Sequence, residues 1–169
     1  IKKIKAGDPL NPENSVGPII DKTHLKRIAD WVNEAKEMGA EVLVGGNIKD
    51  EKHNLFEPTL LTNTGKGMKV CDMEVFGPVA TIEKATSFED AIAQTNDSVF
   101  GLQAGIFTNR VDHMKLAHEE LEFGGVMINN IPGFRIDSMP YGGVKDSGLG
   151  REGIKYTMEE ITEPRLLVY

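Results

Sequence analysis

Helical and extended segments alternate along most of this 169-residue chain. Residues 24–38 carry apolar side chains at the spacing of one helical face, at Leu25, Ile28, Val32 and Ala35, and Gly39 follows as the expected C-terminal cap. The segment EVLVGG then predicts a short buried strand, and the same helix-then-strand order recurs further along. Because strands separated by helices pair in parallel, the pattern predicts an α/β fold with a mostly parallel sheet flanked by helices.

The second half of the chain repeats this order and then changes character. Ser87 and Asp90 predict a capping box at the start of a helix, VATIEKA and QAGIFTN predict strands on either side of it, and GGVMINN predicts a strand after a further helix. A loop rich in glycine and proline follows at residues 131–148. A last helix at residues 151–160 leads into RLLVY, whose consecutive apolar residues predict a strand covered on both faces. An open edge of that kind invites pairing with another chain.

Charge and composition argue against several classes of partner. The chain has 19 basic and 26 acidic side chains, a net charge of −7 and no basic stripe, so we expect neither nucleic acid nor an anionic membrane surface as its partner. No apolar run approaches membrane-spanning length. A single cysteine excludes an internal disulfide framework, and we therefore expect a reducing, cytoplasmic setting.

Three features look like chemical sites but have a simpler interpretation. GLGREG at residues 148–153 matches G-x-G-x-x-G, yet no strand precedes it and too few residues follow for the expected acid, so we interpret it as a turn into a helix. Cys71 has acidic neighbours that disfavour a thiolate, which makes it a small apolar core residue. The four histidines lack a metal-binding spacing, and we expect no metal site.

One acidic residue stands in a segment that does not need it to form a strand. In DMEVFGPVATIE, Glu74 lies two residues before Phe76, at a Phe-Gly-Pro turn. A carboxylate can accept hydrogen bonds from the two vicinal hydroxyls of a ribose, and Phe76 could pack beside a ring. The alternative is a solvated acid at a strand end, which spacing alone favours because surface acids are common.

Several motifs, in the same order, resemble the aldehyde dehydrogenase superfamily. EVFGPV is similar to the family's Glu-x-Phe-Gly-Pro-Val segment, and SVFGLQAGIFTN is similar to its Gly-Leu-x-Ala strand. AGDPLNPENSVGPII, AKEMGAEVLVGG, GGVMINN and MPYGGVKDSGLGREG resemble further segments, so the resemblance covers nearly the whole chain. The loop IPGFRIDSMPYGG and the run GVKDSG are similar to the lactaldehyde and non-phosphorylating glyceraldehyde-3-phosphate branch.

The resemblance implies NAD or NADP as the cofactor and implies roles for three residues. Glu74 matches the glutamate that binds the hydroxyls of the nicotinamide-side ribose. Phe76 matches the phenylalanine beside that ribose and the nicotinamide. Glu152 matches a glutamate near the catalytic water in several members, which is a supporting catalytic role.

The resemblance also implies a substrate pocket and a contact between subunits. Asn129 matches an asparagine at a strand end near the active site, and Tyr141 stands where the family usually has a pocket-lining Phe. Arg135 lies in the loop that shapes the aldehyde entrance, where it either binds an anionic group through two hydrogen bonds or is solvated. Arg151 and Glu163 match a charged pair that ties the dimer contact to the active-site region, so we expect a homodimer or homotetramer.

The same resemblance assigns the chain to one part of an enzyme. Family members attack a small-molecule aldehyde with a cysteine thiolate, transfer a hydride to NAD(P)+ and hydrolyse a thioester, but neither their nucleophile nor their general base matches a position here. We therefore expect a fragment, with residues 1–147 as the C-terminal part of the catalytic domain and residues 148–169 as a tail that returns to the cofactor domain and the dimer interface. An acyl-CoA or acyl-phosphate reductase of the same fold, and a non-catalytic truncated chain that binds subunits, remain alternatives.

We predict that the 169-residue chain alone oxidises no aldehyde, because a nucleophile, a general base and oxyanion donors must converge on one carbon. The measurement is NADH or NADPH absorbance after incubation with NAD+ or NADP+ and a panel of short aldehydes. Turnover that disappears in Cys71→Ser would contradict the prediction and make Cys71 the nucleophile.

Overall fold

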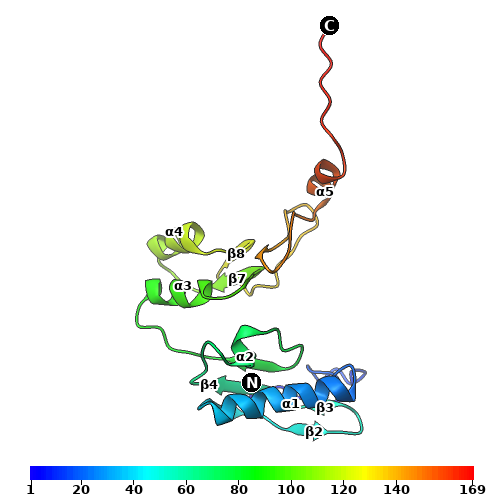
Figure 1. Ribbon diagram of the computed structural model, residues 1–169, viewed down its shortest axis with the longest axis vertical. Coiled ribbons are helices and arrows are strands. Elements are labelled where there is room, and N and C mark those ends of the chain that lie inside the picture. The colour runs from blue at the N-terminus through cyan, green and yellow to red at the C-terminus, as the bar shows by residue number, and fades with distance from the viewer. The chain divides into compact units, whose positions relative to one another are not determined.

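The computed structural model describes residues 1–169, which form two compact units, Ile1–Lys84 and Ala85–Tyr169 (Figure 1). Helices and strands alternate within each unit, which confirms the predicted α/β class. Each unit also has its own buried cluster of apolar side chains. The two units are therefore described separately.

The first unit is organised by α1 (Lys22–Glu37). The helix begins after Asp21, whose side chain accepts a hydrogen bond from the His24 amide at 2.8 Å. The predicted apolar face is confirmed, because the helix buries Leu25, Ile28, Val32 and Ala35. Gly39 has a φ of 106°, in the left-handed region that favours glycine, and closes the helix end as predicted.

Three strands of the first unit form a sheet whose side chains share one core with α1. The strand order in this sheet is β1 (Glu41–Val44), β4 (Thr59–Thr62) and β5 (Val79–Thr81). β4 is antiparallel to β1 and parallel to β5. A separate antiparallel ladder pairs β2 with β3, at Ile48–Asp50 and Leu55–Phe56. Phe56 and Leu61 are fully buried in the same cluster as the α1 face.

The short helix α2 (Lys69–Asp72) carries the only cysteine of the chain. Cys71 is half-buried and packs against the first hydrophobic cluster. This contact supports its interpretation as a core residue. The next segment, residues 73–78, connects α2 to β5 and contains the Glu-x-Phe-Gly-Pro motif.

The second unit places two helices beside a parallel pair of strands (Figure 1). The strands are β7 (Gln103–Ile106) and β8 (Gly125–Ile128). The helices are α3 (Phe88–Asn96) and α4 (Val111–Glu120). Their shared cluster buries Ile92, Ala104, Ala117 and Leu121. Ser87 caps α3 as predicted by accepting from the Asp90 amide at 3.1 Å. The Asp90 carboxylate in turn accepts from the Thr86 amide at 2.7 Å.

Strand pairing differs in detail from a single mostly parallel sheet. Parallel pairing, as predicted, occurs between β4 and β5 and between β7 and β8. The pairs β1–β4, β2–β3 and β6–β9 are antiparallel, where β6 is Phe100–Gly101 and β9 is Val144–Lys145. The turn at residues 51–54 explains β2–β3, since so short a connection can only reverse the chain.

Close backbone contact fixes the long loop at residues 131–148 against the start of β8. A Cβ placed on Gly124 would lie 1.7 Å from the carbonyl oxygen of Gly142. The Gly124 amide donates to the Gly101 carbonyl at 3.0 Å. Only glycine lets the two backbones approach this closely, so the pair Gly124–Gly125 at the start of β8 fits against the pair Gly142–Gly143 of the loop.

The last residues of the chain form no strand here. α5 (Ile154–Glu160) is followed by an extended segment at residues 162–169 (Figure 1). Leu166 and Leu167 in that segment are 86% and 81% exposed. The oligomerisation strand stays a prediction, as does a domain boundary after residue 147. No helix of the chain has both the length and the apolar character needed to span a membrane.

We predict that Gly124→Ala lowers the free energy of unfolding by about 3 kcal/mol, the upper end of overpacking penalties, because the new methyl group collides with the Gly142 carbonyl. Gly133→Ala is the matched control, since its nearest neighbour would be Ile131 Cδ1 at 3.9 Å. Urea unfolding of both variants measures the difference. Equal midpoints would contradict the role assigned to the close contact.

Candidate functional site

The segment at residues 73–78 carries both residues predicted to contact a cofactor. Glu74 is exposed, and Phe76 leaves 70% of its surface exposed. Phe76 has a φ of 49°, in the left-handed region that bulky residues seldom adopt and that costs roughly 1–3 kcal/mol. An exposed aromatic ring on strained backbone contributes little to folding, which makes this segment a candidate binding element.

Two hydrogen bonds from neighbouring elements hold the backbone of this segment. Arg27 of α1 donates from Nη2 to the Val75 carbonyl at 2.7 Å. The Thr59 amide, at the start of β4, donates to the Pro78 carbonyl at 2.8 Å. The backbone is therefore fixed on both sides of Phe76.

The remaining contact leaves no space between α1 and the segment. A Cβ on Gly77 would lie 2.6 Å from Ile28 Cδ1. The carboxylate of Glu74 and the ring of Phe76 nevertheless stay accessible. A carboxylate that accepts hydroxyl protons, next to an accessible ring, suits a ligand with paired hydroxyls and a flat group. The exposure of Glu74 fits a solvated acid as well, so its contact with a ribose stays a prediction.

In the second unit the structure brings together three predicted site residues that the sequence separates. The Arg135 guanidinium contacts Glu152 Oε2 at 3.1 Å and lies over the Tyr141 ring, with its carbon 4.4 Å from the ring centroid. Tyr141 and Glu152 are also joined through their backbones, by hydrogen bonds of 3.0 and 2.6 Å. The arrangement is a small cation–π and ion-pair cluster.

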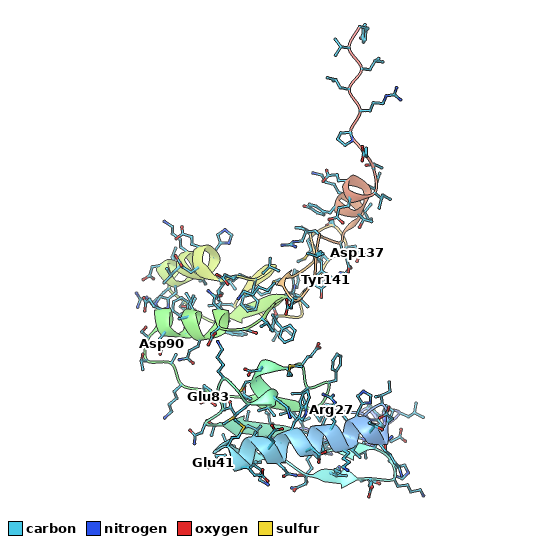
Figure 2. The ribbon with its side chains drawn as sticks, viewed as in Figure 1. Arg27, Glu41, Glu83, Asp90, Asp137 and Tyr141 are labelled. Carbon is cyan, nitrogen blue, oxygen red and sulfur yellow. The ribbon has the colours of Figure 1, made fainter.

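This cluster borders an open hollow of about 520 Å³. The hollow is lined by Arg135, Asp137, Glu152, Gly153, Ile154, Thr157 and Met158. Figure 2 shows Asp137 and Tyr141 in the same part of the second unit. One cation and two carboxylates at its wall give the hollow a mixed charge, so a small polar molecule could be bound there by a single strong donor group.

Asn129 lies directly after β8 and is tied to the loop after β7. Its Oδ1 accepts from the Thr108 amide at 2.8 Å, and its Nδ2 donates to the Thr108 carbonyl at 3.0 Å. Its φ of 54° is a conformation that asparagine tolerates better than most residues. In this chain Asn129 therefore joins the ends of β7 and β8, and its substrate-pocket role stays a prediction.

The structure does not bring Arg151 and Glu163 together. Arg151 Nη1 donates to the carbonyls of Gly143 and Gly150 at 2.9 and 2.7 Å, and its amide donates to Glu160 at 2.9 Å. Glu163 is exposed in the extended terminal segment. Arg151 thus fixes the glycine-rich turn, and the interface role of the pair stays a prediction.

Two residues that the sequence analysis left without a role hold the loop in place. Lys145 Nζ contacts the carbonyls of Asn96 and Ser98 at 2.8 and 3.1 Å and the Glu122 carboxylate at 2.8 Å. Ser147 Oγ accepts from the Gly101 amide at 2.9 Å. Both belong to the run GVKDSG, and its resemblance to the family's loop was the feature of the sequence that could have identified them. No cluster of three or more His, Cys, Asp or Glu side chains suited to a metal occurs in residues 1–169.

Comparison with known proteins gives a consistent result. The sequence model described as "Aldehyde dehydrogenase family" matches residues 1–167. A 3-sulfolactaldehyde dehydrogenase of Priestia megaterium is 44% identical over 99% of this chain and 34% of its own length. The chain thus spans about a third of the length of the curated relatives it matches.

Two solved structures are similar in fold as well as in sequence. Aldehyde dehydrogenase 21 from Physcomitrella patens, in complex with the reaction product succinate, has a TM-score of 0.90 at 41% identity over 96% of this chain and 33% of that one. The glyceraldehyde-3-phosphate dehydrogenase GapN from Methanocaldococcus jannaschii, complexed with NADP, has a TM-score of 0.85 at 42% identity, covering 95% of this chain and 34% of that one.

Proposed function

Because the chain belongs to the aldehyde dehydrogenase family, we propose that it is the C-terminal part of the catalytic region of an NAD- or NADP-dependent enzyme that oxidises an aldehyde to a carboxylic acid. The observation that carries this proposal is the fixed segment at residues 73–78 with its accessible Glu74 and Phe76. In the proposal, residues 1–147 belong to the catalytic domain, and residues 148–169 return to the cofactor domain and the dimer interface.

The residues present fit one end of a nicotinamide dinucleotide. Glu74 would accept the hydroxyl protons of the ribose, and Phe76 would pack beside the ribose and the ring. When bound, the nicotinamide supplies the hydride acceptor. The strain at Phe76 supports this role, because strained backbone is maintained where the surroundings fix it and function uses it. Glu152 would support the reaction by holding water near the hollow of the second unit.

The substrate class is inferred from Arg135 and from the substrates and products that the names of three similar proteins state. Sulfolactaldehyde, succinate and glyceraldehyde-3-phosphate each carry an anionic group, whereas the lactaldehyde named for other relatives is uncharged. Arg135 makes one 3.1 Å bond to Glu152 and has further N–H groups to offer to a second carboxylate, sulfonate or phosphate. Tyr141 would support the guanidinium with its ring, and Asn129 would line the substrate pocket from the end of β8. We therefore assign a small anionic aldehyde as the substrate.

Assembly and location complete the proposal. The exposed apolar run at residues 166–169 would pair with a second subunit, with Arg151 and Glu163 steadying the return of the chain, in a cytoplasmic homodimer or homotetramer. An acyl-CoA or acyl-phosphate reductase is the second candidate, because such an enzyme would use the same Glu74–Phe76 segment. Assays with coenzyme A or phosphate as the acyl acceptor separate the two.

We predict that Glu74→Gln in the complete enzyme slows hydride transfer roughly ten- to a hundredfold, because one charge-assisted hydrogen bond contributes about 1.5–3 kcal/mol. The measurement is pre-steady-state formation of NADH or NADPH. Thioester hydrolysis should change little, since the ribose contact is not part of that step.

Glu41→Gln is the matched control for this measurement, because Glu41 is an exposed carboxylate on β1 in the same unit, away from residues 73–78 in the fold (Figure 2). It should transfer hydride at the wild-type rate. A wild-type rate in Glu74→Gln as well would refute the ribose contact.

A second prediction concerns substrate choice. Arg135→Ala should raise KM for anionic aldehydes roughly tenfold or more and leave KM for neutral aldehydes unchanged, since a hydrogen bond between charged groups contributes about 1.5–3 kcal/mol. Steady-state kinetics with a matched pair, such as a semialdehyde and its uncharged homologue, measures the difference. Arg110→Ala, which removes a surface arginine paired with Asp112, is the control. Equal effects on both aldehyde classes would indicate a solvated loop arginine instead.

A further inference from the structure

Resting on the proposed function, we propose that Arg27 of α1 is a positioning residue for the cofactor site. Arg27 holds the peptide between Val75 and Phe76, with Trp31 stacked against its guanidinium, and thereby sets the direction of the Glu74 and Phe76 side chains. It acts through the segment at residues 73–78 and is not itself expected to touch cofactor or substrate.

The contact is specific in its geometry. Arg27 Nη2 donates to the Val75 carbonyl at 2.7 Å across 48 positions of sequence, in a partly buried environment. A charged donor at this distance makes one of the stronger hydrogen bonds found in proteins. The accepting carbonyl belongs to Val75, which lies between the two residues proposed to face the cofactor. This one hydrogen bond therefore holds the backbone next to both of them.

The strain at Phe76 explains why such a bond is needed. The Val75 carbonyl and the Phe76 amide belong to one rigid peptide plane, and the φ of Phe76 describes rotation about the next bond. A φ of 49° is unfavourable for phenylalanine, so the backbone would relax if the plane were free to turn. Arg27 holds the plane, and the contact of Gly77 with Ile28 blocks movement on the following residue.

The aromatic neighbour restricts the arginine in its turn. Arg27 and Trp31 are four positions apart on α1, and the guanidinium carbon lies 4.4 Å from the centre of the Trp31 ring. The nearby carboxylate of Glu34 is engaged by Lys69 at 2.7 Å. The Trp31 ring thus restricts the Arg27 guanidinium on one side (Arg27 is labelled in Figure 2). Of the two acids beside the same surface hollow, Asp30 and Glu34, the second is engaged by Lys69.

The test uses the complete enzyme and separates cofactor kinetics from substrate kinetics. Arg27→Met keeps the apolar stem and removes the donor, and should raise KM for NAD+ or NADP+ roughly three- to thirtyfold, the range expected for one lost hydrogen bond acting through a neighbour. KM for the aldehyde at saturating cofactor should stay at the wild-type value. Arg27→Lys retains a charged donor and should restore part of the loss, whereas Trp31→Leu should produce a smaller loss of the same kind.

Controls separate positioning from general damage. Ala35→Gly weakens the same helix at its last turn without touching residues 73–78, and Lys26→Met removes a neighbouring exposed cation. Both should leave KM for the cofactor unchanged. In the Glu74→Gln variant, Arg27→Met should raise KM for the cofactor by a smaller factor than it does in the wild-type enzyme. The reason is that both changes act on the same contact with the cofactor.

Two results would overturn the inference. One is a wild-type KM for the cofactor in Arg27→Met. The other is a rise in that KM in Ala35→Gly as large as the rise in Arg27→Met, when both variants lose the same amount of melting temperature. Both leave the proposed function standing. By contrast, a wild-type enzyme that reduces neither NAD+ nor NADP+ with any aldehyde would overturn the proposed function, and this inference with it.

Discussion

The packing of one face of α1 on the core of the first unit is the contact on which the candidate cofactor segment depends. Burying the side chains of Leu25, Ile28 and Val32 contributes about 1.5–3 kcal/mol for each of them. That burial fixes the rotation of the helix about its axis. Because Arg27 precedes Ile28, the same rotation places its guanidinium at the edge of the buried face, against the Val75 carbonyl. The packing that stabilises the core of this unit therefore also sets the position of the candidate cofactor segment.

The second unit fixes its loop by a different means. α5 borders part of residues 131–148 across the open hollow, but it buries none of its own residues there. Instead glycine backbones lie in contact, as at Gly124 and Gly142, and polar side chains fasten the loop ends. Lys145 is one of these side chains, since it donates to the carbonyls of Asn96 and Ser98 where α3 ends. Such a scaffold positions side chains through hydrogen bonds rather than through buried area, and a small backbone shift would move Tyr141 and its neighbours together.

Local features were predictable from the sequence, and contacts between distant residues were not. The buried face of α1 and the Ser87 cap depend on residues within a few positions, so their spacing was sufficient evidence. The antiparallel pairing of β1 with β4 depends on where the chain returns, which periodicity does not encode. Arg27 was missed because its partner is a backbone carbonyl, and a carbonyl leaves no mark in the sequence. Arg135, Tyr141 and Glu152 were identified by resemblance, but their mutual contact required the structure.

The pairing of Arg135 with Glu152 has a consequence for the substrate. Both side chains are substantially exposed, at 46% and 67%, and an ion pair in contact with water contributes little. In the proposed function, an anionic substrate group would therefore take the N–H groups of Arg135 that Glu152 leaves open, and the pair would stay intact. The Glu152 carboxylate, which is engaged through one oxygen only, keeps acceptor positions for a hydrogen bond from water. A single pair would then place the cation proposed to recognise the anionic group next to the acid proposed to hold the water.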